Sequence, residues 1–163
     1  MNHVPKAFSS GFNVGRVMQM GEEPKLYDVT VVWDPNKGGE VQLEGKSSIK
    51  VSRPKGEESS PELYTPEHLF VASVTVCFMN SFIYFTRRMH IDFKSFECVG
   101  SGTLEQIGKS FEITKIEIKS RLVIDSEELR SKFERALYLG AKYCFVGNSM
   151  KSSIAHENEI LVG

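Results

Sequence analysis

Two of the three cysteines, Cys77 and Cys144, are the side chains of this sequence best suited to chemistry. A cysteine thiolate attacks peroxides and disulfides, and two thiols held together can cycle between a dithiol and a disulfide. The two cysteines lie 67 residues apart in the chain, so only the fold can bring them together. Because free cysteine is one of the most buried residue types, core packing without any reaction is the alternative interpretation.

The other cysteine and the histidines favour packing or capping over chemistry. Cys98 lies in a predicted strand and is expected to pack. His68 and His90 lie near the two ends of a predicted helix, and His156 lies near the last predicted strand, so capping or surface roles are expected. No Cys-x-x-Cys motif or cluster of cysteine and histidine has the spacing of a zinc site. The sequence therefore predicts neither a metal centre nor a bound cofactor.

The composition is that of an ordinary globular protein and argues against several functional classes. Of the 163 residues, 40% are hydrophobic and 25% are charged, as in a single folded domain. The 20 Lys and Arg residues balance 21 Asp and Glu residues, so no nucleic-acid or membrane-surface partner is expected. No signal peptide or membrane-spanning run is found, which predicts a cytoplasmic protein. We expect an N-terminal arm over residues 1–24 and a single domain over residues 25–163.

The elements that must position the cysteines begin with three short strands. Residues 27–33 are β-branched and aromatic, and the turn residues 34–39 end them. Two further runs of alternating apolar residues, at 41–43 and 49–51, complete a predicted three-stranded meander. Residues 52–64 are rich in Pro, Gly and charge and predict a loop.

A long helix carries the first candidate thiol. Thr65 is a good cap, Pro66 fits the first helical position, and Glu67 lies in the first turn, where the helix dipole favours an anion. The helix is expected to end near Met89 or His90. Its residues are apolar almost all round, and such a helix is a buried one. In a chain this short, burial on every side predicts a sheet on one side and another subunit on the other.

The C-terminal half predicts two long strands, a second helix and a last strand. The second helix opens on the capping and acidic residues 125–128 and ends near Cys144. A short helical turn is expected over residues 149–153. The three strands are expected over residues 96–105, 110–124 and 159–162.

Two segments around the cysteines resemble a known family. Residues 65–77 read Thr-Pro-Glu-His-Leu-Phe-Val-Ala-Ser-Val-Thr-Val-Cys, with the cysteine ten places after the glutamate. This pattern is similar to the signature of the OsmC/Ohr family, the osmotically inducible and organic hydroperoxide resistance proteins. The segment 144–148, Cys-Phe-Val-Gly-Asn, resembles the second cysteine motif of that family. The order of elements from about residue 27 to residue 162 is similar as well.

The resemblance implies a fold and an activity. The fold would be α+β, an OsmC-like intertwined homodimer whose long buried central helices are wrapped by mostly antiparallel sheet from both chains. The activity would be that of a thiol-dependent peroxidase in oxidative-stress defence. Cys77 would attack an organic hydroperoxide and become a sulfenic acid, and Cys144 would resolve it to a disulfide. A dithiol or another thiol reductant would then restore both cysteines.

The resemblance also implies a role for Glu67 and for a cation near the thiol. In the family an arginine of the first meander turn, held by this glutamate, favours the thiolate. The equivalent turn here offers Lys37, and Arg53 and Arg16 are further candidates. Ten helical residues rise about 15 Å, so Glu67 would act on Cys77 through such a cation or from the partner chain.

Two other functions remain open from the sequence. The missing arginine, together with Phe145 and Gly147 where the family commonly has proline and serine, favours a non-enzymatic binder of a hydrophobic small molecule. The other open function is that of a structural, stress-associated dimer whose cysteines are only packed.

Overall fold

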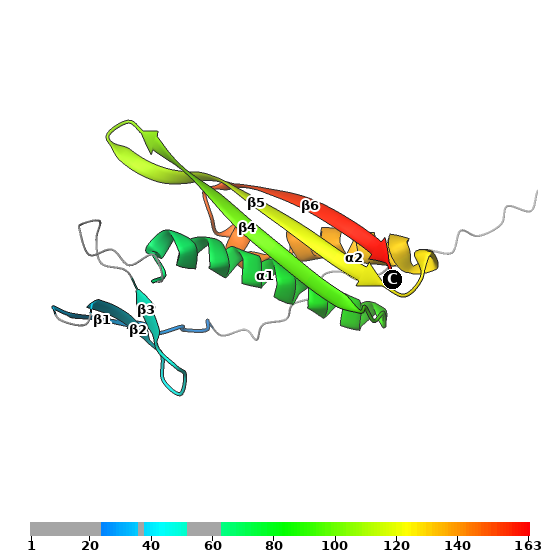
Figure 1. Ribbon diagram of the computed structural model, residues 1–163, viewed down its shortest axis with the longest axis horizontal. Helices are drawn as coiled ribbons and strands as arrows, with labels where there is room; N and C mark the ends of the chain where they lie inside the picture. The colour runs from blue at the N-terminus through cyan, green and yellow to red at the C-terminus, as the bar shows by residue number, and fades with distance from the viewer. Residues whose placement is uncertain (1–23, 36–37, 52–62) are drawn as a thin grey trace, which may run out of the picture.

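The computed structural model describes residues 24–35, 38–51 and 63–163. The predicted N-terminal arm lies outside the described residues apart from its last residue, and most of the predicted loop over residues 52–64 does as well. The described chain contains helices and two separate sheets, which confirms the mixed helix and sheet class (Figure 1).

The first sheet is the antiparallel meander that the sequence predicts. It consists of β1 (Thr30–Asp34), β2 (Gly38–Gln42) and β3 (Ile49–Val51), in that spatial order. The strand β1 begins three residues later than residue 27, where the β-branched and aromatic run begins. In Figure 1 the meander lies near the N-terminal end of the long helix α1, across that helix from the second sheet.

The second sheet contains the two long strands and the last strand. β4 (Ser95–Ile107) and β5 (Ser110–Ile124) form an antiparallel hairpin, and β6 (Ser153–Val162) pairs with β5 in parallel. The sheets are therefore mostly antiparallel, as expected. The predicted last strand over residues 159–162 was too short, since β6 begins at Ser153. Its first half carries several polar residues, which hid the strand pattern in the sequence.

The helix α1 (Pro66–Met89) has the ends that the sequence predicts. The Thr65 hydroxyl accepts a hydrogen bond from the His68 backbone N–H at 3.3 Å. The Thr65 backbone N–H donates to His68 Nδ1 at 3.2 Å, so a histidine takes the place that glutamate usually has in a capping box. At the other end His90 adopts a left-handed conformation, with φ of 52°, and ends the helix. The capping roles expected for both histidines are confirmed.

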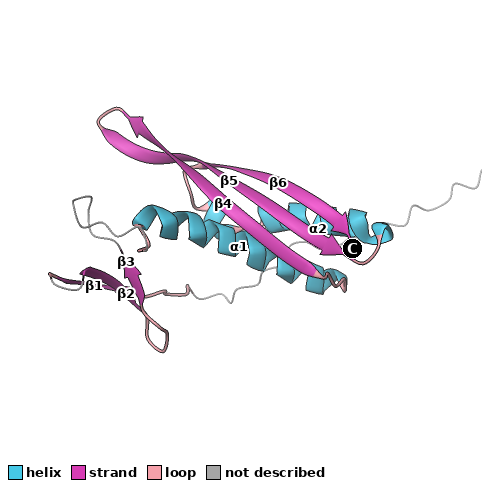
Figure 2. Ribbon diagram, viewed as in Figure 1, coloured by secondary structure: helices cyan, strands magenta, loops and turns pink. Residues whose placement is uncertain are grey.

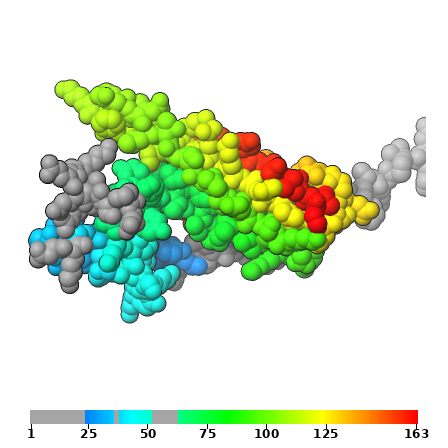
Figure 3. All heavy atoms as spheres, viewed as in Figure 1, coloured from blue at the N-terminus to red at the C-terminus, as the bar shows by residue number. Residues whose placement is uncertain are grey.

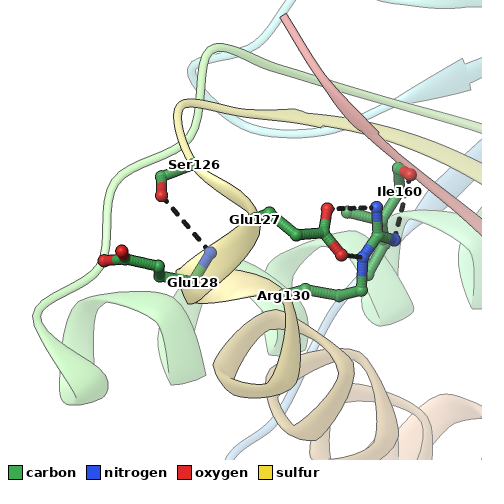
Figure 4. Close-up of polar contacts among 5 residues, drawn as sticks. All are labelled: Ser126, Glu127, Glu128, Arg130 and Ile160. Carbon is green, nitrogen blue, oxygen red and sulfur yellow. Dashed lines mark hydrogen bonds and ion pairs between the residues drawn. The ribbon is translucent and has the colours of Figure 1, made fainter.

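The second helical region is divided into three pieces. A 3₁₀ turn, η2 (Glu127–Leu129), leads into α2 (Arg130–Lys142), and the one-turn helix α3 (Phe145–Asn148) follows. Ser126 caps the start by accepting a hydrogen bond from the Glu128 backbone N–H (Figure 4). The expected helical turn over residues 149–153 was placed wrongly, because the turn lies directly after Cys144.

The start of α2 is tied to the last strand by one side chain. The Arg130 guanidinium pairs with the Glu127 carboxylate, with one N–H···O distance of 2.8 Å, and donates to the carbonyl oxygen of Ile160 on β6 at 3.1 Å (Figure 4). This contact fixes the position of β6 relative to α2. The same two elements form the walls of the candidate site described below.

The core lies between the helices and one face of the second sheet. Figure 2 shows α1 and α2 on the same side of β4, β5 and β6. Phe78 and Phe82 of α1, Phe133 of α2 and Ile116 and Ile118 of β5 are all fully buried. At β4 the helix comes so close that a Cβ atom on Gly100 would lie 2.1 Å from Thr75 Oγ1. Glycine is therefore required at the crossing of α1 and β4.

One side of α1 is bare in the single chain. The sequence predicts that a second subunit covers one side of α1, and this stays a prediction; in the single chain Val76 is 49% exposed and Phe70 is 38% exposed. Contrary to the expectation that no such run exists, α1 is long and apolar enough to cross a membrane, a test that the core helix of a soluble protein also passes. The helix nevertheless packs on α2 and β4 as the central helix of the core.

Figure 3 shows the meander and the tip of the β4–β5 hairpin extending from the body at one end.

Candidate active site: two thiols in contact

The fold brings Cys77 and Cys144 together. Cys77 lies on α1 and Cys144 immediately precedes α3, which packs against α1. The thiol of Cys144 is hydrogen-bonded to the side chain of Cys77 and lies 3.8 Å from the carbonyl oxygen of Val74, one turn earlier on α1. Both thiols are free and buried, with 6% of Cys77 and 3% of Cys144 exposed. The two thiols therefore interact directly in the reduced protein.

The surroundings of Cys144 keep its thiol protonated. Burial, and then the hydrogen bond and charge of Cys77, raise the pKa of the Cys144 thiol to about 11. The backbone N–H groups of Gly147 and Val146 act in the opposite direction, and the Gly147 nitrogen is 3.4 Å from the sulfur. Two backbone donors do not offset the loss of water, so Cys144 is a neutral thiol at pH 7.

Gly147 lets α3 turn closely over the sulfur of Cys144. A Cβ atom at this position would lie 3.3 Å from Cys144 Sγ and 3.1 Å from Ile154 Cδ1. Both distances are tighter than ordinary contacts, so a serine here would press on the thiol and on β6. The glycine at this position, which departs from the family pattern, has a steric reason in this chain.

A cavity of about 440 Å³ lies beside Cys144, between the C-terminal end of α2, α3 and β6. Its walls include Cys144, Gly147, Asn148, Ile154 and His156. A second cavity of about 360 Å³ continues along α2 and β6, and the two share Tyr138, Ala141 and His156. Cys77 does not line either of these two cavities. Of the two sulfurs, Cys144 is the one that this space reaches.

His156 is the residue of this region that the sequence reasoning missed. The expected surface or capping role is wrong, because the imidazole packs on the Phe78 ring with the ring centroids 4.6 Å apart. Its Nδ1 atom is buried and has no hydrogen-bond partner among the described residues. Burial lowers the pKa of His156, so the ring is neutral at pH 7. The missed signal is the alternation along β6, which puts Ile154, His156 and Ile160 on the inner face.

Glu67 is not brought to the thiols. It lies exposed in the first turn of α1, ten helical residues before Cys77 and hence about 15 Å away along the axis. This agrees with the expectation that it cannot reach Cys77 directly. The three candidate cations, Lys37, Arg53 and Arg16, all lie outside the described residues.

Cys98 is a separate, half-buried thiol on β4, where it pairs with Ser120 of β5. Burial and then the charge of Glu97 raise its pKa, as expected for a packed cysteine. Within residues 24–35, 38–51 and 63–163, no three His, Cys, Asp or Glu side chains gather in a group that could hold a metal ion.

Solved structures share this fold at low sequence identity. An OsmC-like protein of unknown function from Vibrio cholerae aligns with a TM-score of 0.74 and 20% identity, over 83% of this chain and 100% of that chain. An OsmC-like protein from Mycoplasma pneumoniae gives a TM-score of 0.72 and 12% identity, over 85% and 99%. The organic hydroperoxide resistance protein OhrB of Bacillus subtilis gives 0.59 and 16%, over 83% and 99%. These likenesses establish the fold.

The sequence itself matches a family model. No curated protein matches the chain. The model described as OsmC-like protein matches residues 57–159, which is more than half of the 163 residues and includes both thiols of the site. The chain therefore belongs to the OsmC-like family.

Proposed function

We propose that the protein is a thiol-dependent peroxidase that reduces organic hydroperoxides in oxidative-stress defence. The observation that carries the proposal is the contact between the buried thiols of Cys77 and Cys144. The Cys77 thiolate attacks the terminal oxygen of the O–O bond, the alkoxide leaves and takes a proton from water to become the alcohol, and Cys77 becomes a sulfenic acid. The Cys144 sulfur then attacks the Cys77 sulfur, water leaves and a disulfide forms. A dithiol reductant returns both cysteines to thiols and is itself oxidised to a disulfide.

The assignment of roles follows from the protonation of Cys144. With a pKa of about 11, only about one Cys144 side chain in ten thousand is a thiolate at pH 7. A peroxide needs a thiolate as its attacker, so Cys144 is poorly suited to the first step. It is suited to the second step, in which it only has to reach a sulfenic acid already in contact with it.

The surroundings support an organic hydroperoxide as the substrate. Cys77 lies between Val74 and Phe78 on an apolar helix, so an apolar group on the peroxide is stabilised near the attacking sulfur. Structural relatives of the same fold include proteins whose names refer to organic hydroperoxide resistance. We propose the reduction of organic hydroperoxides for this chain on the strength of these two observations.

We further propose that the active protein is an intertwined homodimer in the cytoplasm. Val76 and Phe70 on α1 and Val31 and Trp33 on β1 are large apolar side chains between 38% and 66% exposed in the single chain. A second copy would cover such surfaces. A partner chain would also bring a second Glu67, with Lys37, Arg53 or Arg16 as the cation that favours the Cys77 thiolate. Sedimentation at micromolar concentration is expected to give the mass of two chains, and a fully active monomer would contradict this part.

Counting thiols after cumene hydroperoxide treatment tests the activity. The wild-type protein is expected to lose two thiols per chain and to recover both with dithiothreitol. Cys77→Ser is expected to consume no peroxide, whereas Cys144→Ser is expected to accumulate a sulfenic acid at Cys77 that dimedone traps. Cys98→Ser is the matched control and is expected to behave as the wild type. Peroxide consumption by Cys77→Ser at the wild-type rate would overturn the proposal.

The cavity beside Cys144 also favours a second candidate, a binder of a hydrophobic small molecule without turnover. Its volume of about 440 Å³ is within the range of small-molecule sites. In that case the thiol count stays unchanged after peroxide treatment. An apolar fluorescent probe binds to the wild-type protein, and substitutions that fill the cavity abolish its binding.

A further inference from the structure

We propose that the cavity between α2 and β6 is the entrance through which a thiol reductant reaches the disulfide, with His156 as the base that accepts the reductant's proton. The inference rests on the proposed function, because it concerns the disulfide of Cys77 and Cys144. It adds the route by which the disulfide is reduced and the side chain that assists that step.

The position of the two sulfurs sets the direction of the attack. Cys144 lines the cavity of about 440 Å³ and Cys77 does not, so a thiol in this space meets the Cys144 sulfur first. Attack on Cys77 would instead expel Cys144, whose raised pKa makes it a poor leaving group. Access and leaving-group chemistry therefore both favour attack on Cys144.

His156 is placed to take a proton in this space. Its imidazole borders both cavities, so it reaches the solvent-filled space that a reductant would occupy. On its other side the ring packs on Phe78, which fixes its orientation. The buried Nδ1 atom of His156 has no hydrogen-bond partner among the described residues, which costs free energy. A hydrogen bond from a bound reductant would remove this cost.

Burial keeps the imidazole neutral until it acts, because it lowers the pKa of His156. The groups that face the two cavities from α2 and α3 are Lys142, Tyr138, Cys144, Arg130 and Glu134. Arg130 is paired with Glu127, so Lys142 and Glu134 remain as one charge of each sign. The neighbours from α1 and β5, Phe78 and Ile118, are apolar. A neutral ring in these surroundings is able to accept a proton.

The step balances as an ordinary thiol–disulfide exchange. The first thiol of a dithiol gives its proton to His156 and its sulfur attacks Cys144 Sγ. The Cys77–Cys144 bond breaks, a mixed disulfide forms on Cys144, and Cys77 leaves with the bonding electron pair as a thiolate. The second thiol of the reductant then attacks the reductant's own sulfur in that mixed disulfide. Cys144 leaves and takes the proton from the His156 imidazolium, while the proton of the second thiol passes to water.

A single-turnover measurement tests the base. The disulfide is formed with diamide, so that the test does not depend on the peroxide step, and its reduction by dithiothreitol is followed by acid quenching and thiol alkylation. General-base assistance makes the wild-type rate nearly constant between about pH 6.5 and 8.5, because the neutral thiol reacts. In His156→Gln only the free thiolate reacts, so the rate is expected to rise about tenfold per pH unit and to be about a hundredfold lower at pH 6.5. His90→Asn, a histidine change at the end of α1, is the control and should keep the wild-type profile.

The cavity is tested separately from the histidine. Ala141→Leu places a larger side chain in the wall that both cavities share and is expected to slow reduction by dithiothreitol at least about tenfold. Ala155→Leu makes the same change on the exposed face of β6 and should have no effect. A wild-type pH profile in His156→Gln would overturn the role of the base, and a wild-type rate in Ala141→Leu would overturn the entrance. A disulfide that forms with diamide but not with cumene hydroperoxide would overturn the proposed peroxidase and leave this route standing.

Discussion

Replacing Cys144 by serine should change how the stability of the protein depends on pH. The folded chain holds the pKa of this thiol at about 11, against 9.0 for an ordinary cysteine, chiefly because the side chain is buried. A folded-state pKa above the unfolded value means that the thiol favours folding fully below about pH 9. Between about pH 9 and 11 the unfolded chain loses the proton that the folded chain still holds, so stability falls as pH rises.

The magnitude follows from the two pKa values. Each pKa unit corresponds to about 1.36 kcal/mol, so the loss approaches about 2.7 kcal/mol well above pH 11 and is about 2.3 kcal/mol at pH 11. Between pH 8 and pH 10, where measurements are practical, linkage gives a loss of about 1.3 kcal/mol. Serine does not ionise in this range. The stability difference between the wild type and Cys144→Ser should therefore shift by about 1.3 kcal/mol in favour of the variant over those two pH units.

Urea unfolding of both proteins at pH 8, 9 and 10, with a phosphine reductant to keep the thiols reduced, measures this difference. Groups that do not interact with Cys144 titrate alike in both proteins and cancel, and Cys77→Ser in both backgrounds removes the titration of the one thiol that does. Cys144→Ala is the control, since it also cannot ionise and should run parallel to Cys144→Ser. A difference between wild type and variant that stays constant with pH would refute the idea that the fold withholds this proton, and with it the assignment of Cys144 as the second rather than the first nucleophile.

Three further predictions concern the frame that holds the site. Gly100→Ala should lower the unfolding free energy by about 1–3 kcal/mol, because the new Cβ lies 2.1 Å from Thr75 Oγ1, and Thr75→Ala in the same chain should restore part of the loss in a double-mutant cycle. Thr65→Ala should cost about 1 kcal/mol in thermal or urea unfolding by removing the cap of α1, whereas Thr65→Ser should cost little. Ser120→Ala should cost about 1 kcal/mol by breaking the 2.6 Å hydrogen bond to Asn158 that joins β5 to β6, and a loss no larger than that of an exposed Ser153→Ala would contradict it.

The sequence was most informative where local physics decides the structure. The cap at Thr65, the proline after it and the long apolar run determine α1 almost to the residue, because each acts within one turn. The end of the second helix near Cys144 was predicted within two residues, but the turn after it was placed too late, because the packing of α3 against α1 decides its position. The parallel pairing of β6 with β5 could not be predicted from the sequence either, because its register depends on contacts between distant segments.

The candidate site shows the same division. The sequence indicates Cys77 and Cys144 through two motifs, and the contact between them follows only from the packing of α3 on α1. His156 was missed because a polar residue among Ala155, Glu157 and Asn158 has the pattern of a surface strand. The long, regular pairing with β5 turns this stretch into a wall of the site. A polar side chain that faces inward is recognised only once the inner face is known.

The docking of the C-terminal strand has a consequence for how the site responds to motion. Among the described residues β6 is paired along one edge only, with β5, and it carries Ile154 and His156 into the wall next to Cys144. Local opening of this edge strand would therefore expose the Cys144 thiol to solvent while α1 and β4 stay folded. In the proposed peroxidase, access to the Cys144 sulfur is thus coupled to a sub-global opening equilibrium, and amide hydrogen exchange along residues 153–162 reports on it.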